Sequence, residues 1–137
     1  MTIRILVVDD HAVVRHGLRT LLSNRPDWMI IDEAEDGIEA VDKANSLKPD
    51  VIILDVSMPR MDGLEACRRI RKDVPESEIL IVTQHDSAQM MREAMNAGAR
   101  GYVVKSHVTR DLPAAVEAVS QHQTFSSLKN GQAGTRN

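Results

Sequence analysis

The sequence predicts an α/β protein with a doubly wound parallel sheet, built from five strand–helix repeats. Short runs that are almost wholly apolar recur along the chain, as in strands buried on both faces. Between them lie segments whose apolar residues recur at helical spacing. Alternation of strand and helix favours a parallel sheet with helices on both faces.

The five expected strands are the apolar runs at residues 3–8, 29–31, 51–54, 79–82 and 102–104. A stripe of apolar residues three or four positions apart follows each run, as on one face of a helix. The stripes are Val14, Leu18, Leu21 and Leu22; Ala40, Val41, Ala44 and Leu47; Leu64, Cys67 and Ile70; Met91, Ala94 and Met95; and Leu112, Ala115, Val116 and Val119.

Local signals predict where several helices begin and end. Three Asp residues stand three positions before a Glu or Gln, the spacing of a capping box, in which the Asp accepts from backbone N–H groups. The pairs are Asp36 with Glu39, Asp62 with Glu65, and Asp86 with Gln89. Gly98 follows the fourth stripe, where a left-handed C-cap belongs.

A chain of 137 residues fits one domain, which we expect to span residues 1–122. After Gln121 the apolar periodicity stops, so residues 123–137 are expected to form a linker or a disordered tail. The net charge of −3 argues against direct binding of nucleic acid by this segment. No apolar run approaches the roughly 18 residues of a membrane span. The single cysteine, Cys67, favours a reducing cytoplasm.

Polar residues follow four of the expected strands. Asp9 and Asp10 come after the first run, Asp55 after the third, Thr83 after the fourth and Lys105 after the fifth. In open parallel sheets, ligands bind at the carboxyl ends of the strands. Singly, each residue has a structural explanation; Asp10, for example, could be a helix N-cap. Together they predict a site with three carboxylates, a hydroxyl and an ammonium group.

Such a site is suited to a divalent cation and a phosphoryl group. Neighbouring carboxylates repel one another unless a cation is bound, and hard oxygen ligands favour Mg²⁺ (or Mn²⁺). No Cys or His pair has the spacing of a softer metal site. Lys105 and Thr83 would neutralise charge on a phosphoryl group, and Asp55 is the best candidate for a nucleophile that forms an aspartyl phosphate.

These motifs resemble those of the receiver domain of two-component response regulators. The matching segments are residues 7–11 (VVDDH), 54–63 (LDVSMPRMDG), 82–83 (VT) and 101–105 (GYVVK). The resemblance covers residues 3 to about 121 and implies the flavodoxin-like, CheY-like (βα)5 fold, with strand order 2-1-3-4-5.

The resemblance also implies roles for the site residues. Asp55 would receive a phosphoryl group from a phosphohistidine on a sensor histidine kinase. Asp10 would bind Mg²⁺ directly and Asp9 through water, with the backbone carbonyl of Ser57 as a further ligand. Lys105 would hold phosphoryl oxygens.

Thr83, which would also hold phosphoryl oxygens, and Tyr102 would form the switch pair. The hydroxyl would swing to the phosphoryl group and the ring would move inward behind it. The family often has a small residue where this chain has Gln84, and Pro where it has Ser106. Gln84 would either cover the entrance to the site or point into solvent. His85 could face the water that attacks the acyl phosphate, although solvated or capping roles are expected for both His85 and His11.

Further details resemble the NarL/FixJ (LuxR-type) subfamily of transcription regulators. They are residues 8–11 followed by 14–18, residues 97–102, and residues 124–126, where that subfamily enters a linker before a helix-turn-helix domain. This implies transcription regulation through a DNA-binding domain absent from this chain, and a phosphorylation-dependent homodimer. The alternative is a stand-alone single-domain regulator.

We expect no enzyme activity beyond self-catalysed phosphoryl acceptance and dephosphorylation. Aspartyl-phosphate hydrolases share the strand-end Asp and Mg²⁺, but usually carry a second Asp two residues later, where this chain has Ser57. A pseudo-receiver that only binds proteins would usually lack an acidic residue or the Lys, and this chain retains them.

Overall fold

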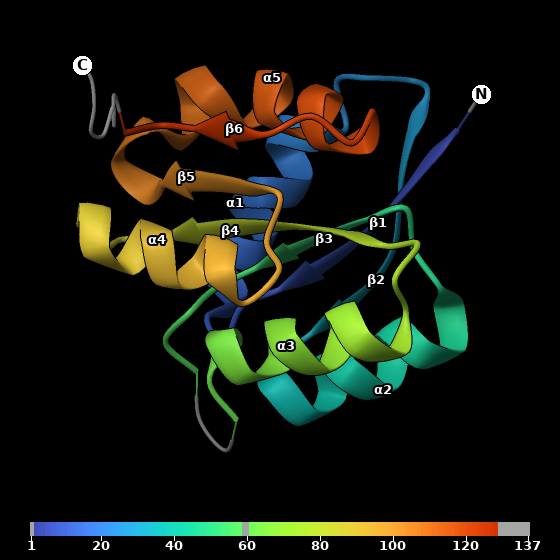
Figure 1. Ribbon diagram of the computed structural model, residues 1–137. Helices are drawn as coiled ribbons and strands as arrows, with labels where there is room; N and C mark the ends of the chain where they lie inside the picture. The colour runs from blue at the N-terminus through green and yellow to red at the C-terminus, as the bar shows by residue number, and fades with distance from the viewer. Residues whose placement is uncertain (1, 59–60, 129–137) are drawn as a thin grey trace.

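The structure, a computed structural model, describes residues 2–58 and 61–128. It contains one parallel sheet between two layers of helices (Figure 1). The strands are β1 (Ile3–Val8), β2 (Trp28–Ala34), β3 (Val51–Leu54), β4 (Glu78–Thr83), β5 (Gly101–Val104) and β6 (Phe125–Ser126). The helices are α1 (Ala12–Leu22), α2 (Gly37–Leu47), α3 (Gly63–Asp73), α4 (Ala88–Asn96) and α5 (Val108–Ser120), with a 3-10 turn η1 (Lys105–His107) before α5.

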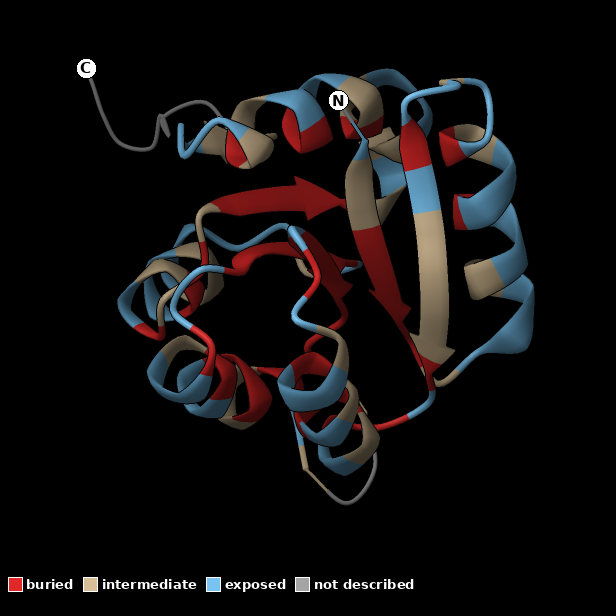
Figure 2. Ribbon diagram, turned by 90° about the vertical axis from the view of Figure 1, so that its right-hand side faces the viewer, coloured by how far each residue is buried: buried red, intermediate tan, exposed pale blue. Residues whose placement is uncertain are grey.

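The sheet has the order β2-β1-β3-β4-β5-β6, and all of its pairs are parallel. The expected order 2-1-3-4-5 is therefore confirmed for the first five strands, and a sixth is added at the edge. The central strands are buried along nearly their whole length, whereas the helices bury only their inner faces (Figure 2). This explains why the central strands are continuous apolar runs.

Each face of the sheet has its own core. On one face, α1 and α5 bury Leu18, Leu22, Leu112 and Val116 against inward side chains of the sheet. On the other face, α2, α3 and α4 bury most of the remaining stripes, with Leu64, Met91 and Met95 only partly buried. This two-layer covering buries both faces of the sheet and leaves its carboxyl edge to the loops.

The helix starts agree with two of the three capping predictions. The Asp36 side chain accepts from the Glu39 N–H and the Asp62 side chain from the Glu65 N–H, each at 2.9 Å. The Asp86 prediction was wrong, because the N-cap of α4 is Ser87. Gly98 follows α4 with a φ of 114°, which fits the expected left-handed ending.

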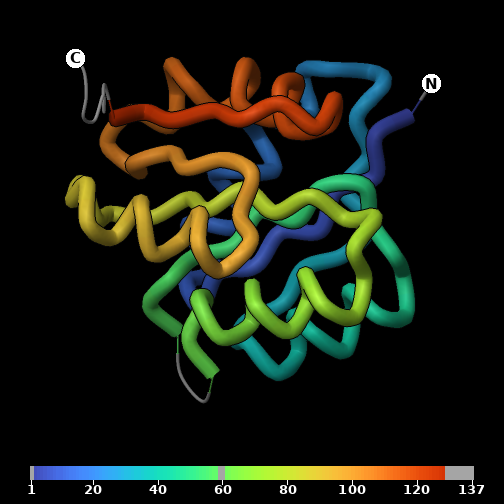
Figure 3. The backbone as a smooth tube through the Cα atoms, in the orientation of Figure 1, coloured from blue at the N-terminus to red at the C-terminus, as the bar shows by residue number. Residues whose placement is uncertain are grey.

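The segment after α5 departs from the expected linker. Phe125–Ser126 forms β6 and runs beside β5 (Figure 3). The Ser127 N–H donates to the Tyr102 carbonyl at 2.8 Å, and the Ser127 hydroxyl accepts from the Val104 N–H at 3.3 Å and donates to Asp111 Oδ2 at 2.8 Å. These bonds cover part of the open edge of β5, which would otherwise expose unpaired backbone groups.

Within residues 2–58 and 61–128, no helix is long and apolar enough to cross a membrane.

We expect Ser127→Ala to lower the free energy of unfolding by about 1 kcal/mol, because it removes the hydroxyl that bridges Val104 and Asp111. Urea denaturation measures this loss, and hydrogen exchange at the Val104 amide should become faster. The control is Ser120→Ala, because the Ser120 hydroxyl donates within its own helix, to the Glu117 carbonyl, and to no other described residue. Equal stability of the two variants would contradict a structural role for the Ser127 hydroxyl.

Candidate functional site

The register of the sheet brings the ends of β1 and β3 together. Val8 pairs with Leu54, so the residues that follow, Asp9 and Asp55, leave the sheet side by side. The Asp55 N–H donates to the Val8 carbonyl at 3.1 Å, which extends the pairing by one residue. Parallel pairing at matching positions thus places two carboxylates at one edge.

Lys105 connects these two carboxylates. Its Nζ lies 2.8 Å from Asp9 Oδ2 and 3.5 Å from Asp55 Oδ2. Both Asp residues are buried, at 1% and 4% exposure. One ammonium group therefore contacts two buried carboxylates, and its shorter contact is with Asp9.

The electrostatics of Asp55 and Lys105 follow from this arrangement. Burial raises the pKa of Asp55 above its ordinary value; Lys105 opposes the shift and the charge of Asp9 adds to it. For Lys105, burial alone would lower the pKa, but the hydrogen bond to Asp9 and the charge of Asp55 raise it. The two neighbouring carboxylates therefore favour the charged form of Lys105, while the negative charge of Asp55 is only partly compensated.

Asp10 lies at the same edge and is partly exposed. Its Oδ1 is buried without a hydrogen-bond partner among the described residues, although His11 Nδ1 lies 3.0 Å away in poor hydrogen-bond geometry. The same nitrogen is 3.2 Å from Asp9 Oδ1. Among the described residues, Asp9, Asp10 and His11 form a group whose ligand atoms all lie within 4.8 Å of one another. A buried unpaired carboxylate oxygen beside further ligands fits a divalent cation.

The structure places His11 in this group, which the sequence reasoning missed. His11 occupies the N-cap position of α1, but its side chain makes no capping hydrogen bond and is 66% exposed, so the capping alternative was wrong and the solvated alternative is confirmed. Asp10 is not the N-cap either. The sequence did contain a signal, since His11 directly follows the acidic pair. It was missed because only a second His or Cys at ligand spacing was considered as a partner, and not a carboxylate.

Thr83 and Tyr102 are linked through the backbone of His85. The Tyr102 hydroxyl donates to the His85 carbonyl at 2.7 Å, and the His85 N–H donates to Thr83 Oγ1 at 3.4 Å. Tyr102 is fully buried, and burial raises the pKa of its hydroxyl. The ring therefore already lies inward in this structure.

The loops after β3 and β4 meet above the edge. Ser57 Oγ and His85 Nε2 lie 3.2 Å apart. Gln84 is exposed and makes no hydrogen bond to another described residue, so its effect on access stays a prediction. The bond between Lys105 and Ser106 is trans. Two residues of the predicted phosphoacceptor loop, Pro59 and Arg60, lie outside the described residues.

Gly63, the first residue of α3, lies against the backbone of Asp55. A Cβ built at this position would lie 2.0 Å from the Asp55 carbonyl oxygen and 2.7 Å from the Cα of Val56. The Gly63 N–H also donates to the Val56 carbonyl at 2.7 Å. The close approach of α3 to Asp55 thus requires glycine.

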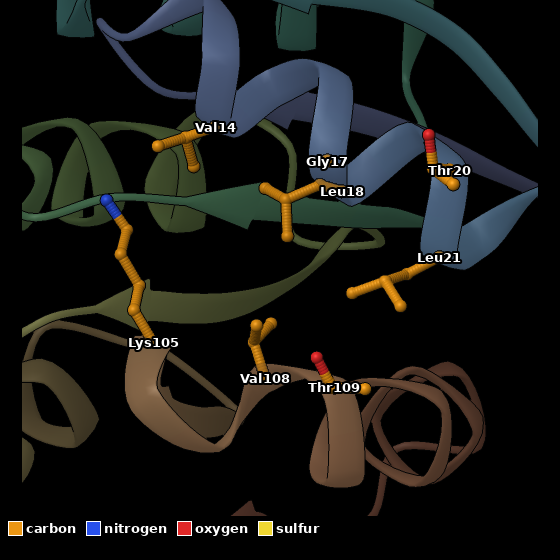
Figure 4. Close-up of a pocket in the computed structure, with 8 residues that line it drawn as sticks. All are labelled: Val14, Gly17, Leu18, Thr20, Leu21, Lys105, Val108 and Thr109. Carbon is orange, nitrogen blue, oxygen red and sulfur yellow. The ribbon is translucent and has the colours of Figure 1, made fainter.

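An apolar groove lies on the other side of Lys105, between α1 and the start of α5. Val14, Leu18 and Leu21 face Val108 across it, and Lys105 stands at one end (Figure 4). This lining offers little to a phosphoryl group. The ammonium group of Lys105 contacts Asp9 and Asp55, so the polar site is distinct from the groove.

The parallel sheet and its carboxyl-edge site define a response regulator receiver domain, and the chain belongs to this family: the family model matches residues 5–117. In sequence, the chain is 38% identical over 124 residues to the response regulator protein VraR of Staphylococcus aureus. That match covers 90% of this chain but only 59% of VraR.

Solved structures agree. A two-component response regulator of the LuxR family from Aurantimonas sp. SI85-9A1 has a TM-score of 0.91 and 37% identity, covering 96% of this chain and 94% of that one. The response regulator domain of Thermotoga maritima CheB has a TM-score of 0.80 and 36% identity, covering 88% and 96%. The chain is thus a CheY-like receiver domain similar to those of LuxR-type transcription regulators.

We expect Gly63→Ala to lower the free energy of unfolding by about 1–3 kcal/mol, because the added methyl group overlaps the Asp55 backbone. Urea denaturation measures the loss. The matched control is Gly17→Ala, where the added Cβ meets nothing within 4 Å and should stabilise α1 by about 0.5–1 kcal/mol. A Gly63→Ala variant as stable as the wild type would show that α3 can move away from Asp55 at no cost.

We expect Asp55→Asn to raise the free energy of unfolding at neutral pH, without divalent cations, because the neutral amide avoids the cost of burying a charge. Folding raises the pKa of the Asp55 carboxyl, so this group makes the folded protein less stable as the pH rises above the ordinary pKa of 3.8. The advantage of Asn should therefore shrink as pH falls toward that value. Urea denaturation at several pH values tests this, and lower stability of the variant at neutral pH would contradict it.

Proposed function

We propose that this chain is a phosphoacceptor module. Mg²⁺-dependent transfer of a phosphoryl group from a sensor histidine kinase to Asp55 switches an output. The observation that carries the proposal is the position of Asp55. It is a buried carboxylate at the end of β3 whose charge is only partly compensated, and it lies at the same edge as Asp9, Asp10 and His11, which could hold a cation. The family requires a histidine-kinase partner for its general function, and the identity of that kinase lies outside this chain.

The nucleophile would be a carboxylate oxygen of Asp55. Oδ1 accepts the Val56 N–H at 2.8 Å, which fixes the orientation of the carboxylate, while Oδ2 faces Lys105. In the transfer, an Asp55 oxygen forms a bond to phosphorus as the bond from phosphorus to the donor nitrogen breaks. The product is an acyl phosphate, and the proton needed by the leaving imidazole comes from the donor or solvent.

Asp10, Asp9 and the Ser57 carbonyl would hold Mg²⁺, together with Asp55. Their hard oxygens fit the ion, and the unpaired Asp10 Oδ1 is a natural ligand. When bound, Mg²⁺ supplies positive charge that offsets the carboxylates and attracts phosphoryl oxygens.

Lys105 and Thr83 would bind the phosphoryl oxygens. Lys105 already reaches Asp55 Oδ2, so a small movement of its flexible side chain away from Asp9 brings the ammonium group to a phosphoryl group on Asp55. Among the described residues, Thr83 Oγ1 accepts one long hydrogen bond, from the His85 N–H at 3.4 Å, and its hydroxyl proton would be available to a phosphoryl oxygen.

The switch would pass through residues 83–85 to Tyr102. Movement of the Thr83 hydroxyl toward a phosphoryl group shifts the backbone at His85, whose carbonyl holds the Tyr102 hydroxyl. Tyr102 also accepts the Ser127 N–H through its backbone carbonyl, so the same strand contacts the segment after α5. Gln84 and His85 would influence access of donor and water to Asp55.

We propose that the output is transcription, through a DNA-binding domain that lies outside this chain. The support is the similarity to LuxR-family regulators and the fact that this chain spans 59% of VraR. One related structure is described as two RcsB dimers bound to two parallel DNAs, which supports a homodimer for this protein too. A stand-alone regulator is the alternative.

The alternative function as an enzyme is that of an aspartyl-phosphate hydrolase. Ser57 stands where such enzymes usually have their general acid, and its hydroxyl contacts His85. We therefore propose no turnover of small phosphoesters.

We expect acetyl phosphate to label the wild-type chain once, on Asp55, and only when Mg²⁺ or a similar ion is present. The carboxylates must be neutralised before another anion can approach. Intact-mass spectrometry measures the added phosphoryl group, with and without EDTA. Labelling of Asp55→Asn, or full labelling of the wild type in EDTA, would overturn the proposal.

We expect Lys105→Ala to retain the divalent-cation site but to be labelled about 10²-fold more slowly, because one charge-stabilising donor is lost. The rate of mass increase with acetyl phosphate measures this. The matched control is Lys72→Ala on exposed α3 surface. Wild-type labelling of the Lys105 variant would show that the ammonium group does not assist transfer.

A further inference from the structure

We propose that His11 supplies a nitrogen ligand to the divalent-cation site and shifts its preference from Mg²⁺ toward transition-metal ions. The inference rests on the proposed function in one respect: both take Asp9 and Asp10 to hold a divalent cation. It assigns a ligand, and a metal selectivity, to a residue for which the sequence predicted only a solvated or capping role.

The first support is the arrangement of the three side chains. His11 Nδ1 lies 3.0 Å from Asp10 Oδ1 and 3.2 Å from Asp9 Oδ1. In an octahedral site with bonds of about 2.1 Å, neighbouring ligand atoms are about 3.0 Å apart. The imidazole nitrogen therefore stands at the separation of a neighbouring ligand from Asp10 Oδ1, the expected direct ligand, and lies beside Asp9 as well.

The second support is that Asp10 Oδ1 has no hydrogen-bond partner within the described residues although the atom is buried. Simple pairing of imidazole with carboxylate would normally give this oxygen a well-directed hydrogen bond. Here the nitrogen is close but poorly directed. A cation bound beside both atoms would give the buried Asp10 oxygen the partner that it lacks.

The third support is the freedom of the His11 ring. The backbone N–H of His11 donates to Asp9 Oδ1 at 2.9 Å, which anchors the residue beside the acidic pair. The side chain makes no capping bond to α1 and is 66% exposed. The one hydrogen bond of the ring among the described residues joins Nδ1 to Asp9 Oδ1 at 3.2 Å, so the ring is already turned toward the acidic pair and can bind an ion there without breaking a helix cap.

The chemistry predicts the selectivity. Mg²⁺ prefers oxygen ligands and gains little from an imidazole nitrogen, whereas Mn²⁺, Co²⁺ and Ni²⁺ gain increasingly in the Irving–Williams order. A site of carboxylates alone would distinguish these ions less. His11 would thus favour binding of transition-metal ions over binding of Mg²⁺.

The decisive experiment is pulsed electron paramagnetic resonance on the full chain loaded with Mn²⁺, which detects a ligating ¹⁴N nucleus directly. We expect nitrogen coupling in the wild type and its loss in His11→Ala. The matched control is His16→Ala, an exposed imidazole on the same helix, in which the coupling should persist. Thermal unfolding of each variant verifies that it is folded.

Calorimetric titration gives an independent measure. We expect His11→Ala to weaken Ni²⁺ binding about tenfold while changing Mg²⁺ binding much less. Mn²⁺ that binds without nitrogen coupling, or coupling that persists in His11→Ala, would overturn the role of His11 and leave the proposed function intact. Failure of the wild type to bind either Mn²⁺ or Mg²⁺ would overturn both.

Discussion

The site depends on one shared ammonium group. Lys105 contacts two buried carboxylates, Asp9 and Asp55, so the charges of these three groups leave one negative charge in excess, and Asp10 adds to it nearby. Parallel register forces this proximity, since Val8 and Leu54 pair and the next residues must emerge together. The fold therefore buries Asp55 at a cost in free energy, and the proposed binding of a cation and a phosphoryl group would offset that cost.

A second buried carboxylate shows how the same fold treats a charge with a structural role. Glu78, at the other end of β4, lies 3.0 Å from Arg71 and 3.1 Å from Arg100, and 2.5 Å from His122. Burial would raise the pKa of Glu78, but the hydrogen bonds from Arg100 and His122 and the nearby charges lower it. Glu78 is thus paired with three basic side chains, while the charge of Asp55 is only partly compensated. The difference lies in the number of partners, since both side chains are buried.

Much of this could be predicted from the sequence, for identifiable reasons. Strands buried on both faces give continuous apolar runs, and their polar endings must meet at one edge, which predicted Asp9, Asp55 and Lys105. The short β6 could not be predicted, because two residues carry no periodicity and their pairing with β5 depends on distant partners. The cap at Ser87 was missed because Asp86 has the same chemistry one position earlier. The place of His11 beside Asp9 and Asp10 was missed because the sequence was searched for a second His or Cys at ligand spacing and not for carboxylate partners.

The most direct test of the central claim is to locate the phosphoryl group after treatment with phosphoramidate, whose phosphorus–nitrogen bond resembles that of phosphohistidine. Borohydride reduction converts an acyl phosphate of Asp into homoserine, and tandem mass spectrometry then identifies the position. We expect homoserine at position 55 alone, formed in the presence of Mg²⁺. Homoserine at position 9 or 10, or a phosphoryl group found on His11 or His85, would contradict the account.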